Sequence, residues 1–114
     1  MIEKLKEKFN VSVNDELISL HIYAAQQKLQ EYRDKFNLFF TELEFNRKVA
    51  DQLSFTLMKF EGDKFKNDRL AMNDKLVKKM NSNLIVYSSD LFYQVMYVYV
   101  ESQQWESIIE LLNF

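Results

Sequence analysis

Few residues in this 114-residue sequence have the type and spacing that catalysis or metal binding requires. His21 is the only histidine and cysteine is absent, so the chain lacks the ligands of a zinc site and the paired Glu-x-x-His motifs of a di-metal carboxylate centre. A single His beside the apolar face of a helix is typical of a packed or partly exposed residue. The one glycine, Gly62, excludes a glycine-rich phosphate loop.

Carboxylates gather in the stretch EGDKFKNDRLAMND, at Glu61, Asp63, Asp68 and Asp74. Their spacing does not fit a calcium loop, whose ligands alternate over about twelve residues around a central glycine. We interpret them as the solvated start of a helix. No spacing singles out another pair of Asp or Glu residues as general acid and base. The sequence therefore predicts a protein that is not an enzyme and needs no cofactor or metal.

The net charge of −2 is unevenly distributed along the chain. Residues 63–80 carry six basic side chains against three aspartates, namely Lys64, Lys66, Arg69, Lys75, Lys78 and Lys79. Residues 82–114 carry four acidic side chains and no Lys or Arg. The basic segment could contact phosphates, but its interleaved aspartates favour a solvent-facing helix over a nucleic-acid site. A third interpretation is head-to-tail contact between the basic segment of one copy and the acidic segment of the next, because such contacts close into rings.

Composition indicates the elements that must carry these side chains. The absence of proline and the single glycine favour helices joined by short loops. The length fits one domain over residues 1–114. Ten Phe, six Tyr and one Trp are more aromatics than a small helical core needs, so we expect some of them at an interface.

Apolar periodicity predicts an all-α bundle of about five helices, over 1–9, 14–35, 39–61, 63–81 and 90–113. The stretch NVSVND separates the first two. One stripe predicts a continuous second helix: Ile18, Ile22, Ala25, Leu29, Tyr32 and Phe36. Gly62 is the expected terminator of the third helix, and whether 14–60 forms one helix or two stays open.

The closing stretch, DLFYQVMYVYVESQQWESIIELLNF, combines strand-forming residues with helix signals. The N-cap cluster Ser88, Ser89 and Asp90 favours two helices, 90–102 and 104–113, folded into a hairpin. A two-stranded ribbon from 84–87 and 94–100 is the alternative. The segment YVYVESQQWESIIELL is similar to the helix–turn–helix of tetratricopeptide-type repeats. It covers barely half of one repeat and has no second copy, so it indicates one hairpin and not a repeat protein.

The segment MIEKLKEKFNVSVNDELISLHIYAAQQKLQEY resembles the start of the head–tail connector (adaptor) family of tailed phages. The matching residues are Leu5, Asp15, Glu16, Leu17, Ile18, Ala24, Ala25 and Tyr32. The resemblance implies a helical virion component, without enzymatic activity, that assembles as a ring beneath the portal and bridges capsid and tail. Residues 82–114 have no counterpart in that family, so the resemblance assigns no individual functional residue.

We therefore expect a structural or assembly protein that forms homo-oligomers through protein contacts. The candidate interface comprises the six basic residues of 63–80 together with Tyr97, Tyr99, Trp105 and Phe114. The alternative is a small helical regulator or inhibitor, encoded by a phage or mobile element, that binds one host or phage protein. The N-terminus has no signal-peptide pattern, and the apolar runs LIVY and VMYVYV fall short of the ~20 residues that span a bilayer. These features predict a cytoplasmic or virion location and no membrane partner.

Overall fold

The computed structural model describes the backbone of residues 2–113 and the side chains of residues 13–113. It contains helices α1 (Ile2–Ala25), α2 (Leu29–Thr41), α3 (Arg47–Leu57), α4 (Lys66–Ser82), α5 (Ser89–Glu101) and α6 (Trp105–Asn113), with a 3₁₀ turn η1 (Asp63–Phe65) before α4. No strand occurs within these residues, so the predicted all-α class is confirmed, with six helices in place of about five. None of these helices has the length and apolar character needed to cross a membrane.

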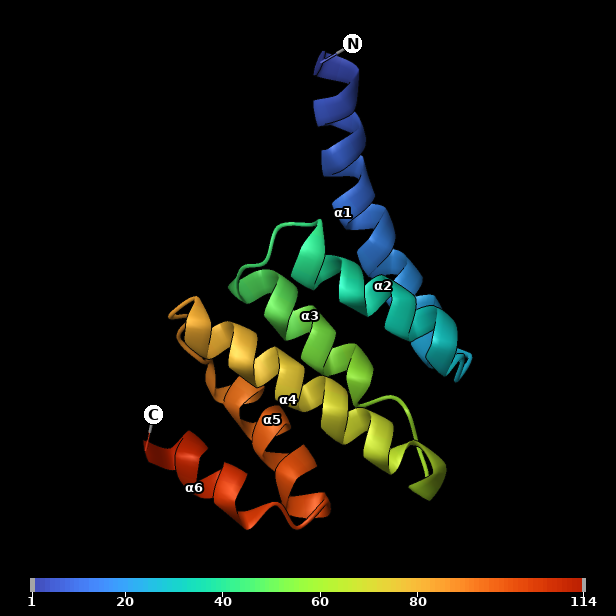
Figure 1. Cartoon of the computed structure of the whole chain (residues 1–114). Helices are drawn as coiled ribbons and strands as arrows, with labels where there is room; N and C mark the ends of the chain where they lie inside the picture. Colours follow the sequence, from blue (N-terminus) through green and yellow to red (C-terminus); the bar gives the residue numbers. More distant parts are fainter. Residues whose placement is uncertain (1, 114) are drawn as a thin grey trace.

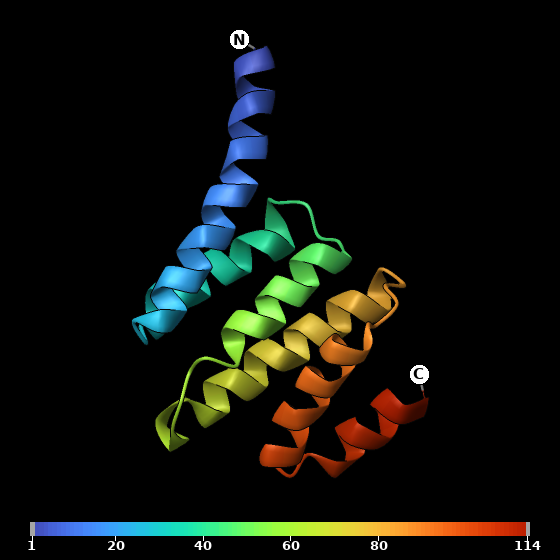
Figure 2. The same cartoon turned by 180° about the vertical axis from the view of Figure 1, so that it is seen from behind.

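The helices form three consecutive hairpins, α1/α2, α3/α4 and α5/α6. The first helices of the hairpins contact one another in the order α1, α3, α5, and α4 also packs on α5. The hairpins follow one another from one end of the molecule to the other (Figures 1 and 2). The hairpin predicted over 90–113 is therefore confirmed, but it is the last of three and not a single motif.

Helix α1 is unbroken where the sequence predicted an interruption between 9 and 14. Each helix end leaves up to about four backbone N–H or C=O groups without an intrahelical partner. Polar residues such as those of NVSVND lower helix propensity by only a fraction of ~1 kcal/mol each, so a continuous helix is more favourable than two extra ends. The first half of α1 extends away from the other helices (Figures 1 and 2).

The prediction of one continuous helix over 14–35 is wrong, because the chain reverses direction between Ala25 and Leu29. Gln27 takes a left-handed conformation there, with φ of 59°. Its Nε2 donates to the carbonyls of Ala24 and Lys59, both at 2.7 Å. These bonds stabilise the turn and attach it to the chain that follows α3.

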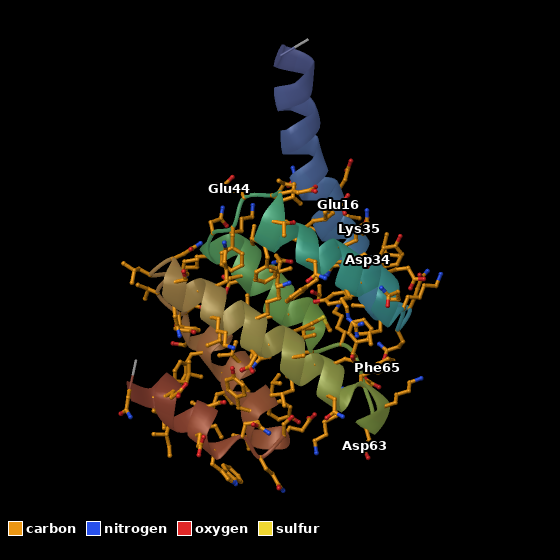
Figure 3. All side chains as sticks on the ribbon, in the orientation of Figure 1. Glu16, Asp34, Lys35, Glu44, Asp63 and Phe65 are labelled. Atoms are coloured by element: carbon orange, nitrogen blue, oxygen red, sulfur yellow. The ribbon has the colours of Figure 1, made fainter. Side chains whose placement is uncertain are left out.

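The reversal changes which residues of α1 are buried. Ile18 and Ile22, predicted to face the core, are 57% and 48% exposed, whereas Leu20 and Ala24 are buried. Ala25 is also exposed. An ion pair between Lys35 Nζ and Glu16 Oε2, 2.9 Å apart, connects α2 to α1 (Figure 3). The hydrogen bond that Lys35 donates to the Glu16 carboxylate raises the pKa of Lys35.

The helix predicted over 39–61 is divided by the loop between Thr41 and Arg47, so the span 14–60 contains parts of three helices. Asn46 begins α3 as its N-cap, and its side chain accepts the backbone N–H of Val49 at 2.9 Å. Helix α3 ends at Leu57, five residues before Gly62, whose φ of 91° introduces η1 instead. The apolar residues of this span nevertheless lie largely in the core, since Phe39, Ala50, Leu53, Leu57 and Phe60 are buried while Leu43 is half-buried.

The second half of the chain follows the sequence pattern closely. The predicted helix 63–81 is η1 with α4, and its regularly spaced apolar residues Phe65, Met72, Leu76 and Met80 are all buried. Ser88 is the N-cap of α5, with its hydroxyl accepting the N–H of Leu91 at 3.1 Å. Residues 84–87 and 94–100 contain no strand pairing, so the ribbon alternative is excluded.

Buried polar contacts fix the hairpins against one another. The Tyr32 hydroxyl donates to the Leu53 carbonyl at 3.1 Å and lies 2.8 Å from Thr56 Oγ1, which joins α2 to α3. Asn73 Nδ2 donates to the Val95 carbonyl at 3.2 Å and joins α4 to α5. Burial raises the pKa of Tyr32, so this hydroxyl remains a donor throughout the ordinary pH range.

Candidate protein-binding surface

Arg69 does not lie on the surface, contrary to its place among the candidate interface residues. It is 7% exposed. Its Nη1 donates to the Phe60 carbonyl at 2.6 Å and to the Gly62 carbonyl at 3.3 Å, and its Nη2 forms an ion pair with Glu101. Arg69 therefore joins the segment before η1 to the end of α5, a role that depends on contacts distant in sequence.

The lysines of η1 and α4 do not form one continuous basic patch. Lys64 lies near the start of this segment, over the ring of Phe65 at 4.8 Å, while Lys78 is exposed near its end. A separation of 14 residues corresponds to roughly 21 Å along a helix. Lys66, between them, is half-buried. Lys64 and Lys78 therefore lie near opposite ends of this segment.

Two of the lysines pack their stems against α2 and the loop that follows it. Lys75 Nζ donates to Asn37 Oδ1 at 2.7 Å and lies 5.0 Å from the centre of the Phe40 ring. Lys79 Nζ lies 6.0 Å from the centre of the Phe45 ring. These contacts give part of the predicted interface a packing role within the chain.

The aromatic candidates divide into exposed and buried residues. Tyr97 and Trp105 are 45% and 58% exposed, as an interface requires. Tyr99, which was predicted to lie at the interface, is instead buried, with 2% of its surface exposed. Its hydroxyl donates to Asp74 Oδ1 at 2.5 Å. Burial, followed by that hydrogen bond, raises the pKa of Tyr99. Phe114 lies outside the described residues.

The layer formed by α1, α3 and α5 carries exposed apolar side chains, of which only Tyr97 was predicted to lie at an interface. They are Ile18, Ile22, Phe55, Tyr93, Tyr97 and Val100. His21 connects two of these helices, since its Nε2 lies 2.7 Å from Gln52 Oε1 and its ring centre lies 5.9 Å from that of Phe55. His21 therefore occupies a partly buried packing position.

Helices α3 and α5 enclose a groove on this layer, here called the α3–α5 groove. One of its two hollows, of about 330 Å³, is lined by Asp51, Gln52, Phe55, Ser88, Asp90, Leu91 and Gln94. The other, also about 330 Å³, is lined by Met58, Phe60, Glu61, Gly62, Arg69, Tyr97, Val98 and Glu101. The first hollow lies between α3 and α5, and the second lies between α5, Arg69 of α4 and the segment that follows α3, so the two hollows follow one another along α5 from its start to its end.

The outer helix α6 carries a separate apolar stripe, here called the terminal face. Trp105, Ile109 and Leu112 recur at intervals of four and three residues and are 58%, 57% and 64% exposed. Leu111, on the other side of α6, is buried against the core. The sequence predicted a helix over 104–113 but did not indicate which side of that helix faces solvent.

No family model matches the chain, and no curated protein or solved structure shows a significant match to it. Among the residues whose side chains are described, no group of three or more His, Asp and Glu side chains is placed to hold a metal ion. The α3–α5 groove and the terminal face are therefore the features that bear on function.

Proposed function

We propose that this chain is a non-enzymatic subunit that acts through protein–protein contacts within an assembly. The terminal face is the single observation that carries the proposal. Monomeric soluble proteins rarely expose large contiguous apolar patches, and aromatic anchors such as Trp are enriched where proteins bind one another. Transferring Trp105, Ile109 and Leu112 from partial to full burial would contribute on the order of 1 kcal/mol each.

The row of hairpins gives this proposal a geometry. Hairpin α1/α2 lies at one end of the row and α5/α6 at the other (Figure 1). Contact between the two different ends of neighbouring copies is heterologous, and such contacts generate a ring when the rotation closes. This favours the ring subunit expected from the resemblance to head–tail connectors of tailed phages. In this proposal the protein works in the host cytoplasm and then in the virion.

A regulator that covers one host or phage protein is the second candidate. The observation that favours it is the one-sided charge of residues 82–114, which hold four acidic side chains and no Lys or Arg. An acidic, apolar hairpin suits a partner with a basic surface, since complementary charge speeds encounter and selects partners.

Light scattering coupled to size exclusion, over a range of concentrations, separates the two candidates. We expect the wild-type chain to form one closed oligomer and Ile109→Asp to remain monomeric. Leu84→Asp is the matched control, because Leu84 is 81% exposed in the turn after α4 and lies off the terminal face. A wild-type monomer at every concentration contradicts the ring and favours the regulator. Equal loss of assembly in both variants contradicts the role of the terminal face.

A further inference from the structure

We propose that the α3–α5 groove binds an extended segment of another protein, with apolar side chains in its middle and a cationic side chain at each end. This site is distinct from the terminal face and does not depend on assembly.

The groove has regularly spaced walls. Asp51 and Phe55 of α3 and its C-cap residue Met58 follow at intervals of four and three residues, which places them along one side of the helix. On α5, the wall residues Asp90, Gln94, Tyr97 and Glu101 follow at intervals of four, three and four. The wall from Asp90 to Glu101 is about 16 Å long at a rise of ~1.5 Å per residue. An extended segment of about five residues has that length.

The middle of the groove is apolar. Phe55, on α3 in the first hollow, and Tyr97, on α5 in the second, contribute exposed ring surface at 48% and 45% exposure. Leu91 and Val98 are buried beneath them and form the floor. Apolar side chains of a bound segment would therefore remove aromatic surface from water in both hollows, which is the main favourable term in such contacts.

Both ends of the groove are acidic. Asp51 and Asp90 line the hollow at the start of α5. Glu61 and Glu101 line the hollow at its other end, where α3 and α5 also finish and their last carbonyls add negative potential. Carboxylates separated by the length of the groove are complementary to two cationic side chains.

Two cations within the chain reduce this negative charge without removing it. Lys59 Nζ lies 4.9 Å from the centre of the Phe55 ring, and Arg69 is paired with Glu101. Four carboxylates against two cations leave two net negative charges along the groove. The same charge repels phosphate groups, so a nucleic acid does not fit this surface.

A fluorescein-labelled hexapeptide, Arg-Leu-Leu-Val-Phe-Arg with blocked termini, tests the proposal by fluorescence anisotropy. Its two arginines are separated by about 16 Å when the peptide is extended. We expect saturable binding that weakens as salt rises, and at least about tenfold weaker binding of the same peptide with glutamate at both ends. Equal binding of the two peptides, or no saturable binding, overturns the proposal.

Variants of the full chain then locate the site. Asp90→Asn combined with Glu61→Gln should weaken binding of the arginine peptide about fivefold, since it removes one carboxylate charge at each end of the groove and exposed ion pairs contribute little individually. Phe55→Ser should weaken both peptides. Glu42→Gln is the control, because Glu42 is exposed at the end of α2, away from the groove. Melting curves from circular dichroism identify any variant that is misfolded, and for that variant Tyr97→Ser replaces Phe55→Ser.

The variants also separate this inference from the proposed assembly. Ile109→Asp should leave peptide binding unchanged, and Phe55→Ser should leave the oligomer unchanged. If Phe55→Ser disrupts the oligomer and the free peptide does not bind, a second copy occupies the groove and the inference is wrong.

Discussion

Gln27 and Glu61 are joined directly although they lie 34 positions apart, because Gln27 Oε1 accepts the backbone N–H of Glu61 at 3.0 Å. The same side chain donates to the carbonyls of Ala24 and Lys59. One amide therefore fixes both the turn between α1 and α2 and the chain that leaves α3. This relationship joins the first hairpin to the second, together with the contacts of Tyr32 and His21 to α3.

Replacing Gln27 should therefore destabilise the whole row. We expect Gln27→Ala to lower the free energy of unfolding by about 2–3 kcal/mol, since it removes three hydrogen bonds; the Cβ at positive φ is the same in both side chains and adds no difference. Gln27→Gly loses the same bonds but tolerates φ of 59°, so it should be about 1 kcal/mol more stable than Gln27→Ala. Urea unfolding measures both, and equal stability of Gln27→Ala and wild type would show that the amide contacts contribute nothing.

The buried guanidinium gives a second prediction. Arg69→Ala should lower the free energy of unfolding by about 2–3 kcal/mol, because the Phe60 carbonyl loses its donor and Glu101 loses its counter-charge. Glu101→Gln should have a smaller effect, below about 1 kcal/mol, since the Glu101 side chain is 34% exposed and water screens it. A double-mutant cycle by urea unfolding gives the coupling between the two. Additive effects would mean that the ion pair makes no net contribution.

Two positions on different sides of α6 should behave in opposite ways. If Trp105 were buried, Trp105→Ala would cost several kcal/mol. At 58% exposure we instead expect less than about 1 kcal/mol, together with loss of assembly. Leu111→Ala should cost about 2 kcal/mol or more, because Leu111 is 4% exposed. Thermal melting and light scattering on both variants check this, and a larger drop in melting temperature for Trp105→Ala would contradict it.

Buried tyrosines predict a loss of stability at alkaline pH. Burial raises the pKa of Tyr87 to about 12, and the pKa values of Tyr32 and Tyr99 are also raised. Above pH ~10 the unfolded chain releases phenolic protons that the folded chain retains, so stability is complete below pH ~10 and falls as pH rises. The slope should approach about 1.4 kcal/mol per pH unit for each such tyrosine. Urea midpoints between pH ~9 and ~11.5 measure it, and a flat profile would contradict the burial.

Tyr99→Phe is the matched variant for this experiment. It removes one titrating group and should make the alkaline fall less steep, although losing the hydrogen bond to Asp74 lowers stability at neutral pH. An unchanged slope would assign the effect to the other tyrosines.

The sequence predicted the second half of the fold well because local signals and packing agree there. Phe65, Met72 and Leu76 recur at helical spacing and are all buried. Ser88 combines the N-cap residue type with the required backbone conformation. Helix capping therefore outweighed the strand preference of VMYVYV in α5.

The turn at Gln27 was not predictable by the same reasoning. No proline or glycine interrupts residues 14–35, so the local pattern favours one continuous helix. The bonds that stabilise the reversal come from residues 59–61, which periodicity does not place beside residue 27. The exposure of Ile18 and Ile22 follows from that same reversal.

The candidate surface was predictable only in part. The surplus of aromatics indicated an interface, and Tyr97 and Trp105 are exposed, but Tyr99 two positions later is buried. The α3–α5 groove requires two helices about 40 residues apart in sequence to lie side by side, which no short-range pattern reveals. Charge counts likewise could not distinguish the buried Arg69 from the exposed Lys78.

The serial arrangement of the three hairpins has a mechanical consequence. Each hairpin contacts its neighbour, so tension applied between the two ends of the chain passes from one hairpin interface to the next. Under tension the helices should detach one after another. We expect α6 to detach first, because its main contact is with α5. A subunit of this build would act in an assembly as a link that gives way stepwise and re-forms when the force is released.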